Sequence, residues 1–331
     1  EKGEVRFTGP TAELLERDDV LHAVFLGRGG DISVTLERPR LPDPNATALG
    51  VEKLTKRYGG LMAINRVDLR VAPGEVLGII GPNGAGKTTL FDLISGFIVP
   101  NGGRVVLAGT DVTDASPDQR ARLGLGRSFQ DARLFPALTV ADTIALAFER
   151  TIGVRDPVAA CLHLPEVADA EADVARRVDE LLHLMGIDAF ADKFVSELST
   201  GSRRIVDLAC VMAHDPQVIL FDEPSSGIAQ RETEALGPLL LRIREATGAS
   251  LLVIEHDMPL ITSISDRLLA LDLGEVVTSG PPTDVVHDPR VVSSYLGTTD
   301  AVIARSGTRP ARRRPLSARR PRAASTGGPR R

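Results

Sequence analysis

The chain has 331 residues, of which 43% are hydrophobic and 25% charged, so it has enough apolar material for one large folded domain or two smaller ones. Its two cysteines, Cys161 and Cys210, fit no disulfide framework or metal-ligand spacing, which favours a reducing, cytosolic setting, and no apolar run approaches the roughly 20 residues of a membrane-spanning helix. The net charge is −5, but residues 305–331 contain ten arginines and no acidic residue, so the rest of the chain carries about −15. This acidic body argues against nucleic acid as a ligand.

Composition divides the chain into four stretches. Residues 1–27 contain a strand-like and a helix-like segment, and residues 28–47 carry the glycines and prolines of a linker. Residues 48–299 alternate short β-branched runs with longer helical patterns, which is typical of an α/β sheet with crossover helices. Residues 300–331 are rich in Arg, Pro, Ser and Gly and too poor in apolar residues to form a core, so we expect them to be disordered.

A phosphate-binding loop is predicted between an apolar strand at 76–80 and a helical pattern at 90–94. The intervening sequence reads G-x-x-x-x-G-K-T-T in the strand–loop–helix context that this motif requires. Its glycines let backbone N–H groups converge on an anion, and the helix N-terminus adds partial positive charge. Lys87 is expected to reach the β- and γ-phosphates, and the Thr88 hydroxyl to bind Mg²⁺. The predicted nucleotide-binding residues of the loop are Gly81, Pro82, Asn83, Gly84, Ala85, Gly86, Lys87, Thr88 and Thr89.

A second apolar run at 218–221 predicts another buried strand, and it ends in Asp222-Glu223-Pro224. An aspartate at the carboxyl end of a strand beside the phosphate-binding loop is placed to hold Mg²⁺ through water. Glu223 follows directly and can reach the water that attacks a γ-phosphate. An apolar strand that simply ends in acidic residues is the alternative, but the preceding loop favours the functional interpretation.

Four further motifs follow the same order as in one large family. They are Lys56-Arg57-Tyr58-Gly59-Gly60, Ser128-Phe129-Gln130, Leu198-Ser199-Thr200-Gly201-Ser202 and Ile254-Glu255-His256-Asp257. Over about residues 48–299 the chain thus resembles ATP-binding cassette (ABC) proteins. Taken singly, each residue has a plainer interpretation, such as a packing tyrosine, a loop glutamine, a helix N-cap serine or a surface histidine.

The resemblance implies an α/β fold: a RecA-like P-loop NTPase core with an antiparallel β subdomain and an α-helical subdomain. It implies that Tyr58 stacks on adenine and that Glu223, His256 and Gln130 are catalytic. Mg²⁺, the cofactor together with ATP, would be held by Thr88, Gln130 and Asp222. Two cassettes would enclose two nucleotides, and the signature residues Ser199, Thr200 and Gly201 would act on the partner's nucleotide.

Other stretches are similar to the ATPase subunits of branched-chain amino acid uptake systems: 128–135, 254–258, 288–291 and 295–297. This resemblance implies a peripheral protein on the cytoplasmic side of the cell membrane. Its partners would be transmembrane permease subunits, a second cassette (separate or fused) that forms a homo- or heterodimer and, indirectly, a periplasmic or extracellular solute-binding protein. The alternatives are a soluble ABC-type ATPase acting on ribosomes or DNA, and a degenerate cassette that binds ATP as a regulator.

Two departures from the family pattern lie in the expected dimer interface. The usual signature is Leu-Ser-Gly-Gly-Gln, whereas Thr200 and Ser202 stand here in place of a glycine and the glutamine. Ala229 stands where an Asp or Asn usually crosses to the partner. We expect both changes to affect the turnover rate and not the capacity for hydrolysis, because Lys87, Asp222, Glu223 and His256 are present.

The N-terminal stretch resembles the segment 274–297, which is the short C-terminal segment of the branched-chain group. Three motifs, Gly-Glu-Val, Gly-Pro and Leu-Gly, begin at Gly3 and recur from Gly274 in the same order with one gap. Residues 1–27 are therefore expected to be a remnant of a preceding cassette, and the chain a fragment of a longer or fused protein. An integral N-terminal strand and helix is the alternative.

This interpretation predicts that deletion of residues 1–47 leaves MgATP affinity and thermal stability nearly unchanged, because a closing segment without its own cassette lacks the surface that it packs on. Calorimetric melting and nucleotide titration of the shortened chain measure both quantities. A melting temperature lower by several degrees, roughly 1 kcal/mol or more in a domain of this size, would favour the integral alternative.

Overall fold

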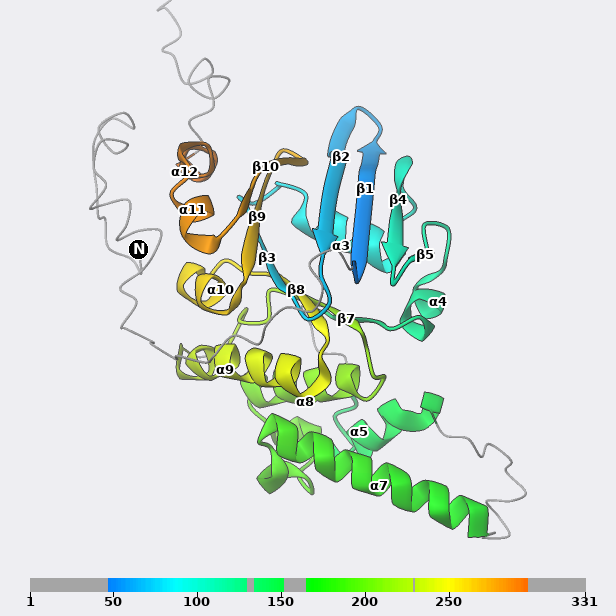
Figure 1. The fold of residues 1–331 in the computed structure, drawn as a ribbon. Helices are drawn as coiled ribbons and strands as arrows, with labels where there is room; N and C mark the ends of the chain where they lie inside the picture. Colours follow the sequence, from blue (N-terminus) through cyan, green and yellow to red (C-terminus); the bar gives the residue numbers. More distant parts are fainter. Residues whose placement is uncertain (1–46, 130–133, 152–164, 229, 297–331) are drawn as a thin grey trace, which may run out of the picture.

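The computed structural model describes residues 47–129, 134–151, 165–228 and 230–296, which build two β-sheets and a group of helices (Figure 1). The larger sheet has the strand order β10-β9-β3-β8-β7-β6. Its five parallel strands are β3 (Val76–Ile80), β6 (Leu125–Ser128), β7 (Val218–Asp222), β8 (Ser250–Ile254) and β9 (Arg267–Asp272). The edge strand β10 (Glu275–Gly280) runs antiparallel to β9. All residues of β3, β7 and β8 are buried, as their continuous apolar runs require in a sheet covered on both faces.

The smaller sheet is antiparallel, with the strand order β2-β1-β4-β5. Its strands are β1 (Leu49–Tyr58), β2 (Leu61–Val71), β4 (Gly102–Leu107) and β5 (Thr110–Asp111). The long hairpin of β1 and β2 turns at Gly59-Gly60, so Tyr58 lies at the end of the sheet.

Helices cover the parallel sheet and extend away from it (Figure 1). Those near the sheet are α3 (Lys87–Ser95), α4 (Pro117–Arg122), α8 (Thr200–Met212), α9 (Gln230–Thr247), α10 (Met258–Ile264), α11 (Pro282–Val286) and α12 (Pro289–Leu296). Helices α5 (Val140–Ala147) and α7 (Pro165–Met185), with the short turns Phe148–Thr151, Asp188–Phe190 and Val195–Glu197, lie on the side away from the antiparallel sheet and form the helical subdomain (Figure 1).

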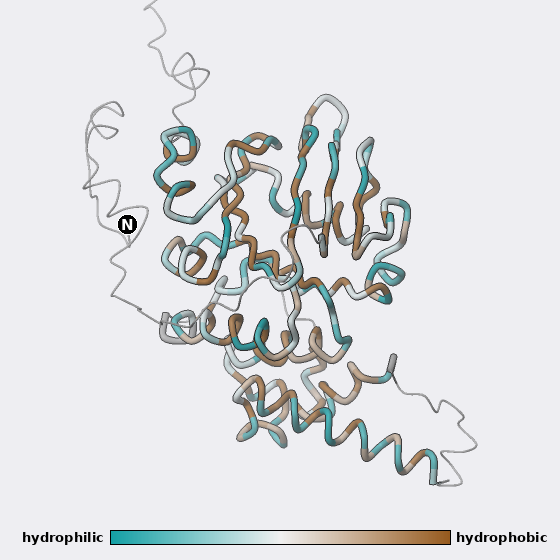
Figure 2. Tube along the Cα trace, in the orientation of Figure 1, coloured by the Kyte–Doolittle hydropathy of each residue, from teal (hydrophilic) through white to brown (hydrophobic). Residues whose placement is uncertain are grey.

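Two apolar clusters hold these layers together, one on each side of the parallel sheet. In one cluster, the side chains on one face of β3, β7 and β8 pack against the antiparallel sheet and α3. In the other, the side chains on the opposite face of the same strands pack against α8, α9, α10 and the helical subdomain. Hydrophobic residues accordingly follow the central strands, whereas α7 shows alternating polar and apolar residues along its length (Figure 2).

The predicted fold class is confirmed: an α/β core carries an antiparallel β subdomain and a helical subdomain. The predicted strands at 76–80 and 218–221 correspond to β3 and β7, and the segment 274–296 contains β10, α11 and α12. The expected elements in residues 1–27, the linker to residue 46 and the tail from 300 lie outside the described residues. Among the described helices, none combines the length and apolar character needed to cross a bilayer.

A buried arginine fixes the end of α3, the helix that follows the phosphate-binding loop. Arg120 of α4 is 1% exposed, and its guanidinium donates to the backbone oxygens of Leu93, Ile94, Thr113 and Ala115. The first two are carbonyls in the last turn of α3, where a cation also opposes the negative end of the helix dipole.

We predict that Arg120→Ala lowers the free energy of unfolding by about 3 kcal/mol, because it leaves several buried carbonyls without donors. Denaturant titration measures this loss. Arg122→Ala is the matched control, since Arg122 is exposed and pairs with the exposed Asp118 at 3.5 Å. Equal effects of the two substitutions would contradict the assigned role of Arg120.

Candidate functional site

A pocket of about 370 Å³ opens where the antiparallel sheet meets the phosphate-binding loop. Backbone and side chains of the loop form its floor, Tyr58 at the end of β1 and Leu61 at the start of β2 form one wall, and Leu273 and Glu223 complete it. The lining residues are Tyr58, Leu61, Met62, Ala63, Asn83, Gly84, Ala85, Gly86, Lys87, Thr88, Thr89, Glu223 and Leu273. The structure therefore brings Tyr58 and seven of the predicted loop residues together. The other two, Gly81 and Pro82, are not part of the lining.

The phosphate-binding loop begins where β3 ends and continues into α3. Gly86, which precedes the first helical residue, has a φ of 101°, and a Cβ there would lie 2.6 Å from the carbonyl oxygen of Ala63. A side chain at this position would thus be both strained and blocked by β2. The loop can therefore lie close to the antiparallel sheet while the first residues of α3 line the pocket.

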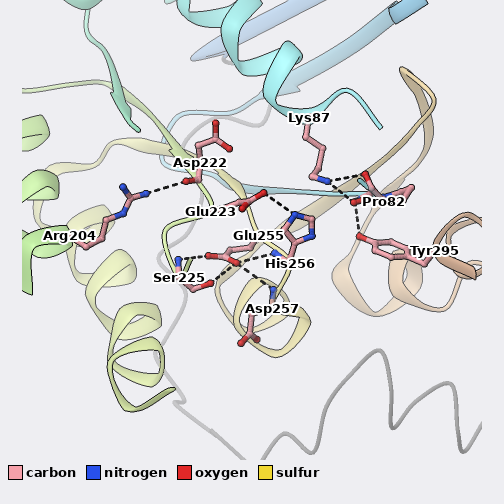
Figure 3. Close-up of polar contacts among 11 residues, drawn as sticks. Pro82, Lys87, Arg204, Asp222, Glu223, Ser225, Glu255, His256, Asp257 and Tyr295 are labelled. Atoms are coloured by element: carbon pink, nitrogen blue, oxygen red, sulfur yellow. Dashed lines mark hydrogen bonds and ion pairs between the residues drawn. The ribbon is translucent and has the colours of Figure 1, made fainter. Parts of the chain in front are cut away.

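Lys87 is 7% exposed, and its ammonium group donates to the backbone oxygens of Gly81 at 2.7 Å and Pro82 at 3.1 Å (Figure 3). Burial lowers the pKa of Lys87, and the nearby carboxylates of Glu223 and Asp222 oppose this shift. Gly81 and Pro82 thus hold the lysine through their carbonyls. A polyanion in the pocket would supply better partners for the same ammonium group.

Glu223 and His256 form a pair at the edge of the pocket. His256 Nε2 lies 2.9 Å from Glu223 Oε1, and both side chains are partly exposed (Figure 3). Glu223 follows β7 with a φ of 47°, which is unusual for a residue with a side chain, and its N–H donates to Ile254 O at 3.0 Å. These two of the three predicted catalytic residues therefore come from the ends of neighbouring parallel strands, as expected for this type of sheet.

Glu255 lies beneath this pair and joins two loops. It is 1% exposed, and its carboxylate accepts from the Ser225 N–H at 2.7 Å, the Ser225 hydroxyl at 2.8 Å and the His256 N–H at 3.0 Å (Figure 3). Ser225 belongs to the loop after Glu223. The orientation of the histidine therefore depends on the conformation of that loop.

Two arginines surround Asp222. Arg127 of β6 pairs with Asp222 Oδ2 at 3.3 Å and with Asp92 at 2.7 Å, and Arg204 of α8 donates to Asp222 O at 3.1 Å and to Phe129 O. Burial raises the pKa of Asp222, and Arg127 opposes this shift. Arg204 thus connects α8 to the backbone that precedes position 130. Gln130 itself lies outside the described residues.

The donors present suit Mg²⁺ held together with a nucleotide. Among the described residues no cluster of three or more His, Cys, Asp or Glu side chains could form a complete metal site. Mg²⁺ usually takes one or two protein oxygens and completes its shell with phosphates and water. A carboxylate at Asp222 and a hydroxyl at Thr88, which lines the pocket, provide such a partial set.

The signature residues lie elsewhere on the chain and do not line the pocket. Ser199 caps α8, and its hydroxyl oxygen accepts from the Ser202 N–H at 3.1 Å, so the plainer interpretation as a helix cap is confirmed. Thr200 is exposed and Gly201 is buried at the start of α8. A role of these residues toward a partner's nucleotide remains a prediction, and Ala229 lies outside the described residues.

Several residues of this region have no role predicted from the sequence: Leu61, Arg127, Arg204, Glu255, Leu273 and Tyr295. Arg127 immediately precedes a predicted motif, Glu255 lies within one, and Tyr295 belongs to one of the stretches shared with the branched-chain group. Their positions in or beside these motifs were signals from which a role at the site could have been predicted. Leu61, Arg204 and Leu273 gave no signal of their own, because only the fold brings them to the site.

Comparison with known proteins identifies the family. Residues 64–226 match the ABC transporter family. The chain is 34% identical to the high-affinity branched-chain amino acid transport ATP-binding protein LivG of Escherichia coli K12 over 249 residues, 75% of this chain and 97% of that protein. It is 35% identical to the sulfate/thiosulfate import ATP-binding protein CysA of Caulobacter vibrioides, over 72% of this chain and 66% of that protein.

Solved cassettes share the fold. The ADP conformation of MJ1267, an ATP-binding cassette of an ABC transporter, aligns with a TM-score of 0.65 at 27% identity and covers 76% of this chain and 99% of its own. The dimeric structure of MJ0796, a bacterial ABC transporter cassette, aligns with a TM-score of 0.60 at 25% identity and covers 71% and 98%. The chain therefore belongs to the ABC transporter family, as an ATP-binding and ATP-hydrolysing subunit.

Proposed function

We propose that this subunit hydrolyses MgATP in a head-to-tail dimer and thereby drives uptake of branched-chain or other hydrophobic amino acids through a membrane permease. The observation that carries the catalytic part is the pairing of Glu223 with His256 beside a pocket floored by the phosphate-binding loop. In this arrangement Glu223 polarises the attacking water and His256 contacts the γ-phosphate. Lys87 exchanges its carbonyl partners for phosphate oxygens and neutralises their charge.

Mg²⁺ would be held by Thr88 and Asp222, with Gln130 as the third predicted ligand, and would supply positive charge to the β- and γ-phosphates. Tyr58 would carry the adenine. The tyrosine is 47% exposed and lines the pocket, which leaves its ring accessible to a base. The Lys56 ammonium lies 5.3 Å from the centre of this ring.

The proposal of a dimer rests on the separation of two motifs. Loop residues line the pocket, whereas the signature residues of the same chain do not. A second cassette placed head to tail would bring its Ser199, Thr200 and Gly201 to this pocket. The similarity to the dimeric MJ0796 cassette supports this arrangement.

Amino acid uptake is favoured by the extent of the similarity to LivG. That protein matches over 97% of its length, whereas the sulfate import relative matches over 66%. The segment 274–296, which resembles the C-terminal segment of the branched-chain group, folds as a strand and two helices. The proposed location is the cytoplasmic face of the cell membrane, where the permease would bind the cassette. A solute-binding protein would deliver the amino acid on the other side.

The role of Glu223 predicts that Glu223→Gln retains MgATP binding but hydrolyses ATP at least about 100-fold more slowly, because the amide cannot act as a base. Lys87→Ala should instead lose nucleotide affinity. Phosphate release and nucleotide titration separate these effects. Glu245→Gln, an exposed position on α9, is the matched control and should hydrolyse at the unmodified rate. Hydrolysis by Glu223→Gln at that same rate would refute the assignment.

The proposed dimer predicts complementation between two inactive subunits. Ser199→Asp keeps an oxygen to cap α8 but places negative charge where a partner's γ-phosphate would lie. A mixed dimer of Lys87→Ala and Ser199→Asp subunits retains one intact composite site and should recover part of the ATPase activity that each variant lacks alone. Tagged co-purification verifies the mixed dimers. If verified mixed dimers were completely inactive, this would count against the proposal that one intact composite site can hydrolyse ATP.

A further inference from the structure

The last described helix, α12, reaches the phosphate-binding loop through the Tyr295 side chain. The N–H of Gly81, the first residue of the loop, donates to the Tyr295 hydroxyl at 2.7 Å (Figure 3). Pairing of β3 ends at Ile79 against β8 and at Ile80 against β9, so Gly81 lies just beyond the ladder. The tyrosine thus provides an acceptor for a loop N–H at the point where strand pairing stops.

Gly81 is also confined by its other neighbours. A Cβ at this position would lie 2.1 Å from the carbonyl oxygen of Leu271 and 3.1 Å from the Ala85 side chain. Its own carbonyl accepts from the Lys87 ammonium. The Lys87 and Tyr295 side chains reach the loop from opposite sides (Figure 3). The position of the carbonyl that holds the lysine is therefore set partly by Tyr295.

The C-terminal part of the chain holds the loop at a second point. The N–H of Gly274, in the turn between β9 and β10, donates to Ala85 O at 2.9 Å. The helix α12 is itself anchored, because Val291 is 3% exposed in the apolar cluster that includes α11, and Tyr295 packs against the same cluster. Burial raises the pKa of Tyr295 to about 12, so the phenol stays protonated above the pH at which an exposed tyrosine ionises.

We propose that Tyr295 is a positioning residue for nucleotide binding: its hydroxyl holds the start of the phosphate-binding loop, and with it Lys87, in the conformation that receives the phosphates. This inference deepens the proposed function at the same site and rests on it. A loop already held in place loses less conformational freedom when the nucleotide binds, so the contact contributes to affinity and not only to folding.

The test compares Tyr295→Phe with Ser294→Ala in the full chain. Phenylalanine retains the buried ring and removes only the hydroxyl, whereas the Ser294 hydroxyl donates to Val291 O within α12 and does not reach the loop. Tyr295→Phe should raise the Kd for MgADP, measured by calorimetry, about fivefold, equivalent to about 1 kcal/mol. The KM for ATP should rise in parallel, while kcat at saturating ATP changes much less.

The outcomes are distinguishable. A Tyr295→Phe protein that binds MgADP like the unmodified chain, or that weakens binding only as much as Ser294→Ala, overturns the inference. Failure of the unmodified chain to bind MgADP would instead contradict the proposed function.

A spectroscopic measurement tests the geometry independently of activity. The chain has two tyrosines and no tryptophan, so in Tyr58→Phe the ultraviolet phenol signal belongs to Tyr295 alone. Near pH 10, where an exposed tyrosine is about half ionised, this signal should remain that of the neutral phenol. Half-ionisation at that pH in the folded protein would contradict the buried contact with Gly81.

Discussion

A buried lysine at the carboxyl edge of one parallel sheet is the constraint around which the site is organised. The Lys87 ammonium is largely shielded from water. Its charged form is stabilised by hydrogen bonds to the Gly81 and Pro82 carbonyls and by the negative charges of Asp222 and Glu223. A charge in such surroundings is stable only if its partners are held firmly. Because phosphate oxygens are stronger partners than carbonyls, the same arrangement would favour contact of the lysine with the phosphates of a bound nucleotide.

The residues that surround Lys87 at the site are in turn held by groups from distant parts of the chain. Arg127 and Arg204 position Asp222, Glu255 connects His256 to Ser225, and Tyr295 holds Gly81. Arg204 belongs to α8, at the base of the helical subdomain, and Tyr295 to the last described helix. Movement of either element is therefore able to change the surroundings of the bound phosphates, because packed and hydrogen-bonded contacts transmit displacements of this kind.

The motifs predicted much of this site because they combine special residue types with a required local structure. The glycine-rich loop, the apolar run before Asp222 and the long α/β alternation each determine a backbone conformation nearby. The contacts of Arg204 with Phe129 and of Tyr295 with Gly81 join residues 75 and 214 positions apart. Such pairs have no spacing rule, since they depend on how α8 and α12 pack on the sheet. The buried Arg120 was missed for the same reason, because its charge alone suggests an exposed residue.

The altered signature illustrates how a local change can be accommodated in one chain and still affect a dimer. Ser202 stands where glutamine is usual, and its N–H and hydroxyl both contact the Ser199 hydroxyl at 3.1 Å. The helix start is thus satisfied within the subunit, as capping requires. If Ser199 also binds a partner's γ-phosphate, its hydroxyl proton must turn from Ser202 to the phosphate oxygen. In the proposed dimer, replacement of glutamine by a short hydroxyl side chain would therefore leave the start of α8 intact and place its cost on dimer closure, where one donor has two competing acceptors.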